Sequence, residues 1–198
     1  MATPAKVRRP GRHALRLCAL FIVGGLSSQV LARGQVGEAA PSFELERLTG
    51  GRVQSAWLRG KPTVLVVGRT QRAAPPCKEW ALALIERYAA TSVFQVIVVE
   101  KAWFIPKSLV RAKVRGFVPA ALHDRVLLEW NTAFADAYAV DKQDAPVVFV
   151  LDGDARIRWR YQGPMTQSAL GQLARTLGSL PVVASGGHDD SGANHPQP

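Results

Sequence analysis

The residues of this chain with the clearest chemical meaning form one short stretch, Ala74-Pro75-Pro76-Cys77. With cysteine in place of Ala74 it would read Cys-Pro-Pro-Cys, the pattern of a dithiol redox site. A single thiol remains, so the stretch indicates where a site lies more clearly than what that site does.

The flanking residues predict a strand, a loop and a helix around this stretch. Thr63 to Val67 is rich in β-branched residues and lacks polar alternation, which is typical of a central strand covered on both faces. Pro75 and Pro76 suit the first turn of a helix, where an N–H group has no intrahelical partner. Apolar residues then recur at helical spacing: Trp80, Ala81, Leu84, Ile85 and Tyr88.

Cys77 falls in the first turn of this predicted helix, where two interpretations are open. The partial positive charge of a helix N-terminus and the adjacent Lys78 favour the thiolate and a lowered pKa. Alternatively, Cys77 is a small apolar residue packed beneath the loop. Arg69 and Arg72 in that loop either attract an anionic substrate and support a thiolate, or are simply solvated.

Residues 1–32 are predicted to be a secretory signal peptide. A basic region ends at Arg16, an apolar stretch from Leu17 to Leu26 follows, and Val30-Leu31-Ala32 precedes the expected cleavage point. The alternative is an uncleaved membrane anchor, although the apolar stretch is shorter than the roughly 20 residues that span a bilayer. Either way, the folded part is expected to be extracytoplasmic, in the periplasm.

Export changes what the cysteines can do. Cys18 lies in the predicted signal peptide, so the mature chain keeps only Cys77 and cannot form an intramolecular disulfide. Cys77 is therefore either buried and inert, or reactive with something outside its own chain.

The charge distribution argues against a nucleic-acid partner. The formal net charge is +10, but five basic residues precede Arg33 with no acidic residue among them. The remaining charges are interspersed and form no basic tract interleaved with aromatic side chains.

Residues 33–183 are expected to fold as one domain, and residues 184–198, rich in Gly, Ser, Asp, Asn, His and Pro, as a disordered tail. His188, Asp189, Asp190 and His195 are assigned to that tail, so neither a metal nor a cofactor is expected.

The rest of the chain adds strands and helices on both sides of the central unit. Phe43 to Val53 predicts a β-hairpin that turns at Thr49-Gly50-Gly51. Within 101–125 we expect a basic amphipathic helix, whose face is either solvated or placed on a membrane surface. The other predicted elements are a strand at Val93–Val99, a helix at Trp130–Tyr138, a strand at Val147–Leu151, a returning strand on which Ile157, Trp159 and Tyr161 alternate, and a helix capped by Thr166 and running through Leu177.

This order of elements resembles the thioredoxin-like superfamily, in its extracytoplasmic peroxiredoxin- and TlpA-related (AhpC/TSA-type) branch. The resemblance covers residues 37–178. Its matching stretches are Gly37 to Phe43, Leu58 to Pro62, Pro75 to Glu79 and Pro146 to Asp152. A looser resemblance, to the YtfJ-like periplasmic proteins, involves Gly68-Arg69-Thr70, Ile105-Pro106, Val147 to Asp152 and Trp159. The resemblance implies an α/β thioredoxin-like fold, a central mixed sheet flanked by helices with the N-terminal hairpin as an extension.

The same resemblance implies roles for individual residues. Cys77 matches the resolving cysteine of a thioredoxin site, whereas the attacking position holds Ala74. Peroxiredoxins place a threonine or serine three residues before a single reactive cysteine and a proline four residues before that; here those positions are Ala74 and Thr70. Pro146 would be a cis-proline that faces the loop and shapes a substrate groove.

Two hypotheses follow for an exported protein with a degenerate site. In one, Cys77 and Pro146 are catalytic, and Arg69, Thr70, Arg72 and Pro76 bind a thiol- or disulfide-bearing protein or a small thiol. Cys77 then acts as a single redox thiol that an external thiol recycles. In the other, the domain is a catalytically silent module that binds a protein at the old groove. A domain with no site at all is the third reading, and contact with a membrane is expected only through an uncleaved N-terminal segment.

Overall fold

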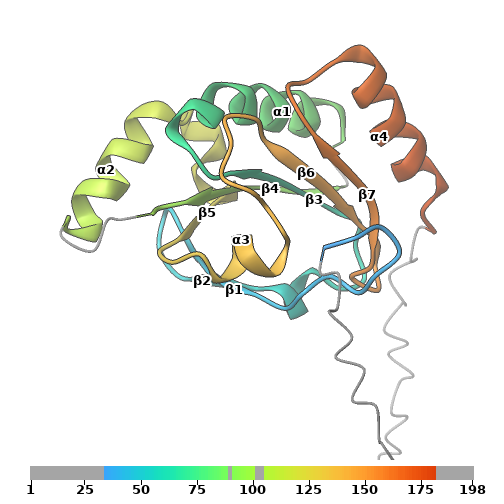
Figure 1. Ribbon diagram of the computed structural model, residues 1–198, viewed down its shortest axis with the longest axis horizontal. Helices are drawn as coiled ribbons and strands as arrows, with labels where there is room; N and C mark the ends of the chain where they lie inside the picture. The colour runs from blue at the N-terminus through green and yellow to red at the C-terminus, as the bar shows by residue number, and fades with distance from the viewer. Residues whose placement is uncertain (1–33, 89–90, 101–104, 182–198) are drawn as a thin grey trace, which may run out of the picture. The chain divides into compact units, whose positions relative to one another are not determined.

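In the computed structural model, residues 34–88, 91–100 and 105–181 are described (Figure 1). The predicted signal peptide at 1–32 and tail at 184–198 lie outside these residues. The described strands form one sheet in the order β2-β1-β5-β4-β3-β6-β7. The strands are β1 (Glu44–Arg47), β2 (Arg52–Gln54), β3 (Thr63–Gly68), β4 (Ser92–Val98), β5 (Val126–Glu129), β6 (Val147–Leu151) and β7 (Ile157–Gln162). The α-helices are α1 (Ala74–Arg87), α2 (Lys107–Phe117), α3 (Ala133–Ala137) and α4 (Gln167–Ser179), and the 3-10 turns are η1 (Ser55–Leu58), η2 (Gln71–Ala73) and η3 (Ala120–Arg125).

The sheet is mixed, as predicted. Strands β3, β4 and β5 are parallel neighbours, and β6 runs antiparallel to β3 on its other side. Every residue of β3 is buried, which explains its continuous apolar sequence. The predicted N-terminal hairpin is confirmed: β1 pairs with β2, and β1 also joins the sheet through β5.

Helices cover both faces of the sheet (Figure 1). One face packs under α1 and α4, where Trp80, Leu84 and Leu173 are fully buried against Val64 and Val66. The other face packs against α3 and the hairpin. Both helices on the first face were predicted, and Thr166 caps α4 by accepting a hydrogen bond from the N–H of Ala169 at 3.1 Å.

Strand β5 was missed by the sequence analysis. Its four residues follow η3 directly, and all four are buried between β4 and β1. The predicted helix at 130–138 shortens to α3, because β5 ends only at Glu129 and residues 130–132 form the connection.

Strand β7 departs from simple alternation because a bulge interrupts its pairing with β6. Trp159 lies opposite Val150, but the next pair is Ile157 with Leu151, so one residue is extra on β7. Ile157 therefore joins the cluster on the α3 face, whereas Trp159 and Tyr161 pack with Trp80 on the α1 face. The predicted alternation therefore holds for Trp159 and Tyr161, and the bulge places Ile157 on the other face.

None of the helices among residues 34–88, 91–100 and 105–181 is long and apolar enough to cross a bilayer.

Candidate functional site

The predicted site lies at one edge of the sheet. The parallel strands β3, β4 and β5 all end there, and the antiparallel β6 begins there, because Val67 pairs with Val147. Cys77 sits in the first turn of α1, which follows β3, and Pro146 immediately precedes β6. The fold thus brings together the Cys77 loop and the Pro146 loop, as the sequence predicted.

Cys77 is fully buried, in agreement with the second of its two interpretations, a small apolar residue packed beneath the loop. Its relative exposure is 0%, and it packs with Val66, Ala73 and Trp80. Burial raises the pKa of the Cys77 thiol to about 12, opposite in direction to the lowering that the first interpretation required. The thiol is protonated at neutral pH.

The end of β3 fits closely over the cysteine. A Cβ atom at Gly68 would lie 2.8 Å from the Cys77 Sγ and 3.6 Å from the Cβ of Ala73. Glycine at this position therefore lets the strand pass directly over the sulfur. The strand end and η2 together form the cover of the thiol.

Pro146 does not have the geometry expected of it. The peptide bond between Ala145 and Pro146 is trans, so the expected cis-proline is wrong. Pro146 is buried, and its carbonyl accepts a hydrogen bond from the N–H of Gly163 at 3.0 Å. That bond joins the start of β6 to the end of β7.

The three loop residues predicted to bind substrate bind the chain itself. Arg69 donates from Nε to Glu100 at 2.6 Å and from Nη1 to the Val140 carbonyl at 2.6 Å. The hydroxyl of Thr70 accepts from the N–H of Ala73 at 3.2 Å and donates to Asp144 at 2.9 Å.

Arg72 completes the attachment with an ion pair to Asp144 at 3.3 Å. Its side chain nevertheless stays 84% exposed, whereas that of Arg69 is 16% exposed. We call these contacts of Arg69, Thr70 and Arg72 the loop clamp. The clamp fixes residues 69–73 against residues 136–144.

Two acidic residues of this edge were missed by the sequence analysis. Glu100, just after β4, accepts from Arg69 and from the Lys142 ammonium, each at 2.6 Å. Glu129 ends β5 and is 2% exposed; its carboxylate accepts from the N–H groups of Phe134 at 2.5 Å and Ala135 at 3.2 Å. A sequence signal for both was present, because each glutamate directly follows a run of apolar residues. Glu129 could not be placed at this edge because strand β5 had not been predicted.

Glu129 has an unusual protonation equilibrium. Burial raises its pKa to about 7, and the hydrogen bonds from Phe134 and Ala135 only partly oppose this effect. The Asp136 carboxylate raises the pKa further, whereas the Arg69 guanidinium lowers it. Glu129 therefore changes charge near neutral pH.

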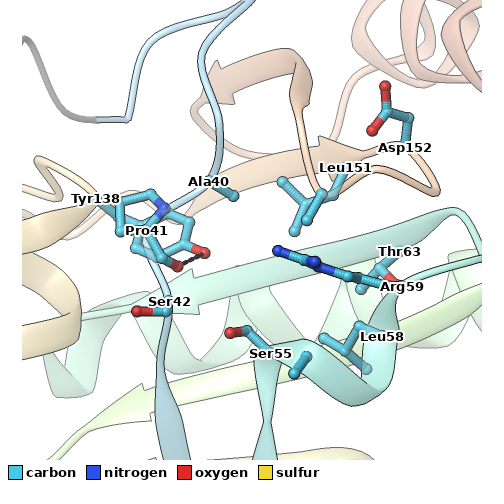
Figure 2. Close-up of a pocket in the computed structure, with 12 residues that line it drawn as sticks. Ala40, Pro41, Ser42, Ser55, Leu58, Arg59, Thr63, Tyr138, Leu151 and Asp152 are labelled. Carbon is cyan, nitrogen blue, oxygen red and sulfur yellow. Dashed lines mark hydrogen bonds between the residues drawn. The ribbon is translucent and has the colours of Figure 1, made fainter.

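Two cavities lie away from the thiol. One, of about 120 Å³, borders Thr63 and Leu151, at the opposite end of β3 from Gly68. Figure 2 shows Arg59 and Tyr138 on its wall, with Tyr138 donating a hydrogen bond to the Pro41 carbonyl at 2.8 Å. The second, of about 250 Å³, is lined by residues that include Glu46, Lys107, Glu129 and Trp130. The linings of both cavities exclude Cys77 and Pro146.

A mixed sheet whose central strand leads into a helix with a cysteine in its first turn defines a protein of the thioredoxin-like class. Solved structures share this fold. A putative thiol:disulfide interchange protein DsbE from Chlorobium tepidum is 20% identical, with a TM-score of 0.57 over 72% of this chain and 98% of that one. The thioredoxin domain of a thiol-disulfide oxidoreductase from Bacteroides vulgatus is 10% identical, with a TM-score of 0.56 over 72% and 98%. An exposed lipoprotein thioredoxin from Streptococcus pneumoniae is 16% identical, with a TM-score of 0.52 over 68% and 98%.

Within that class, the sequence matches the model of the AhpC/TSA family over residues 36–160. The chain belongs to the AhpC/TSA family. No curated protein matches it in sequence.

The close approach of Gly68 to Cys77 can be tested by adding one methyl group. Gly68→Ala places a Cβ 2.8 Å from Sγ, and relieving that overlap should lower the free energy of unfolding by about 1–3 kcal/mol. Chemical denaturation measures this loss. In a Cys77→Ala background the same change should cost clearly less, because the sulfur is gone. Gly116→Ala, where a Cβ meets nothing within 4 Å, is the matched control. An equal cost in both backgrounds would contradict the packing described.

The raised pKa of Glu129 predicts a pH-dependent stability. In the folded chain the pKa of Glu129 is about 7, above the ordinary value of 4.5 that applies to the unfolded chain. The stabilisation that protonated Glu129 gives the folded state is therefore fully present below pH 4.5 and is lost as the pH rises through 7. The free energy of unfolding should fall by about 3 kcal/mol across that window on account of this group. Glu129→Gln should flatten the profile, whereas Glu79→Gln on the exposed face of α1 should leave it unchanged. A constant difference between wild type and Glu129→Gln at all pH values would refute the assignment.

Proposed function

We propose that this protein is an extracytoplasmic binding module of the AhpC/TSA family that recognises a thiol- or disulfide-bearing protein without exchanging disulfides itself. The observation that carries the proposal is the state of Cys77. The sulfur is 0% exposed, its pKa is about 12, and the position three residues earlier is Ala74. A thiol in this state supplies almost no nucleophile at neutral pH.

The surface above the thiol is suited to binding. Arg72 and Pro75 are exposed, and Pro76 is partly exposed, beside the exposed Asp144. The loop clamp holds this surface in one conformation, so a partner would meet a preorganised site and would not bear the entropic cost of ordering the loop. Prolines in the first turn of α1 add to that rigidity.

The partner class and the location rest on similarity and on the N-terminal sequence. The similar structures are described as a thiol:disulfide interchange protein, a thiol-disulfide oxidoreductase and an exposed lipoprotein thioredoxin. A domain that shares their fold is suited to the same kind of partner, a protein with exposed cysteines. The basic and apolar segment before Arg33 supports export to the periplasm, by cleavage or as an anchor.

A second candidate function keeps redox chemistry at Cys77. It is favoured by the position of this thiol in the first turn of α1, beneath a cover whose outermost ion pair, Arg72 with Asp144, is solvent-exposed. On opening of that cover, the Cys77 thiolate would attack a partner's disulfide, form a mixed disulfide and release one thiolate of the partner. Two equivalents of an external small thiol would then complete the cycle. They are oxidised to their disulfide, and the mixed disulfide is cleaved to the Cys77 thiol and the partner's second thiol.

The reactivity of Cys77 separates the two candidates. At pH 8, a thiol with a pKa of about 12 should be alkylated about a thousandfold more slowly than an unfolded cysteine. The measurement is the rate of iodoacetamide modification in a Cys18→Ser chain across pH, with the same chain in urea as the reference. A native rate within about tenfold of the reference, with an inflection below pH 8.5, would establish the redox candidate instead.

The binding surface is tested by capture and by matched charge reversals. Protein captured from an extracytoplasmic extract should be the same, by mass spectrometry, for wild type and Cys77→Ser. Arg72→Glu should reduce capture about tenfold, because it repels Asp144 and changes the exposed face of the loop. Arg87→Glu, at the far end of α1, is the control and should change nothing. Loss of capture in Cys77→Ser alone, or equal losses in both charge reversals, would contradict a thiol-independent surface at this loop.

A further inference from the structure

The cavity beside Thr63 and Leu151 has no part in the proposed function, because it lies at the opposite end of β3 from the Cys77 loop. Its walls are residues 40–42, residues 55–59 and residues 151–155 (Figure 2). Apolar side chains supply much of the lining: Ala40, Pro41, Ala56, Leu58, Leu151 and Ala155. Its volume is about 120 Å³. Since a cavity of about 150 Å³ can hold benzene, this one has room for roughly five or six non-hydrogen atoms.

Backbone hydrogen bonds fix the walls of this cavity to one another. The N–H of Ala40 donates to the Ala155 carbonyl at 2.7 Å, and the N–H of Gly60 donates to the Gly153 carbonyl at 2.8 Å. Both the N-terminal segment and the end of η1 are therefore tied to the turn between β6 and β7. A ligand would enter a cavity that the fold has already formed, without the entropic cost of ordering its walls.

The inner end of the cavity has no free hydrogen-bond donor on its two buried hydroxyl residues. Thr63 is 1% exposed and Tyr138 is 0% exposed. The Tyr138 hydroxyl donates to the Pro41 carbonyl at 2.8 Å, and the Thr63 hydroxyl donates to the Lys61 carbonyl at 3.4 Å. Burial raises the pKa of Tyr138 far above its ordinary value, so the phenol stays neutral. This end of the cavity suits a hydrocarbon chain better than a charged group.

Asp152, the acidic residue of the lining, is occupied within the fold. Its Oδ1 accepts from the N–H of Asp154 at 3.0 Å and from that of Arg156 at 2.8 Å, and its Oδ2 accepts from Arg158 at 2.5 Å. Figure 2 shows the carboxylate of Asp152 turned away from the Arg59 side chain. The Arg158 guanidinium therefore balances the charge of Asp152, and the charge of Arg59 is left to the cavity.

Arg59 supplies the cation of the cavity lining and is exposed, so it lies at the mouth. Figure 2 shows its guanidinium extending over the cavity toward Pro41. Within the described residues no carboxylate pairs with Arg59, in contrast to the ion pairs of Arg69 and Arg158. A guanidinium whose donors are free can hold a carboxylate through two parallel hydrogen bonds.

We infer that this cavity binds a short-chain monocarboxylic acid, with the alkyl chain inside and the carboxylate on Arg59 at the mouth. This assignment goes beyond the proposed function and does not depend on it, since no residue of the loop clamp lines the cavity. A phosphate or a dicarboxylate would place a second charge where Arg59 is the lining's cation and the interior is apolar. A glutamate side chain of a partner would enter with its carboxylate first, which puts the charge at the wrong end.

Titration of the isotope-labelled full chain with sodium butyrate, at constant ionic strength, tests the assignment by amide NMR spectroscopy. The resonances of Ala56 and Ala155 should shift saturably, with a dissociation constant on the order of 1 mM, whereas those of the Cys77 loop should not shift. Acetate should bind about tenfold more weakly, because two fewer methylene groups are buried. Butyramide, which has the same shape without the charge, should also bind about tenfold more weakly.

Two variants and two further probes complete the test. Arg59→Gln should weaken butyrate binding about tenfold, whereas Lys61→Gln, an exposed cation outside the lining, should change it less than about twofold. The inference is overturned if butyrate causes no saturable shift, if butyramide binds as tightly, or if both variants lose affinity equally. It is also overturned if N-acetylglutamic acid amide binds more tightly than butyrate, which indicates a protein side chain. Equal competition by inorganic phosphate, which indicates a general anion site, overturns it as well.

Discussion

The packing of Cys77 beneath Gly68 is the contact on which the rest of the site depends. The strand can cross directly over the sulfur because residue 68 lacks a side chain, and this places the first turn of α1 against the sheet. Trp80, one turn further along, is fully buried, and its indole N–H donates to the Gly163 carbonyl at 3.2 Å. Its ring lies 5.9 Å from that of Tyr161. The packing of α1 against the sheet therefore connects the central strand β3 to β7.

Because α1 packs in this position, only the short loop of residues 69–73 connects the end of β3 to the start of α1. The loop clamp holds this loop with polar contacts, because residues 69–72 are too polar and too near solvent to be held by packing alone. Arg69 is the strongest of these contacts, since its guanidinium is largely shielded and bonded to both a carboxylate and a carbonyl. Charged residues that look available for substrate in the sequence are thus used to position the loop.

The sequence predicted the scaffold well, because apolar periodicity and turn residues act locally. The strand at Thr63, the helix after Pro76 and the cap at Thr166 could all be read from neighbouring residues. The missed strand β5 is only four residues long, and its burial comes from strands distant in sequence. Arg69 and Thr70 likewise contact Val140 and Asp144, which lie 71 and 74 residues further along the chain. Arg69 also contacts Glu100, which is 31 residues away. No spacing within the sequence reveals such pairings. The state of Cys77 depends on the total burial of its sulfur, which a helix-terminus argument does not include.

Burial of the thiol also suits the compartment in which the chain is proposed to work. A lone accessible cysteine outside the cytoplasm is exposed to oxidation and to unwanted mixed disulfides, and both reactions proceed through the thiolate. A thiol with a pKa of about 12 beneath a clamped loop is protected twice, by protonation and by exclusion of the oxidant. In the proposed function, the domain recognises a cysteine-bearing partner while its own cysteine stays out of the exchange. Ala74 in place of a second thiol and the burial of Cys77 both fit the proposed function, which is recognition without exchange.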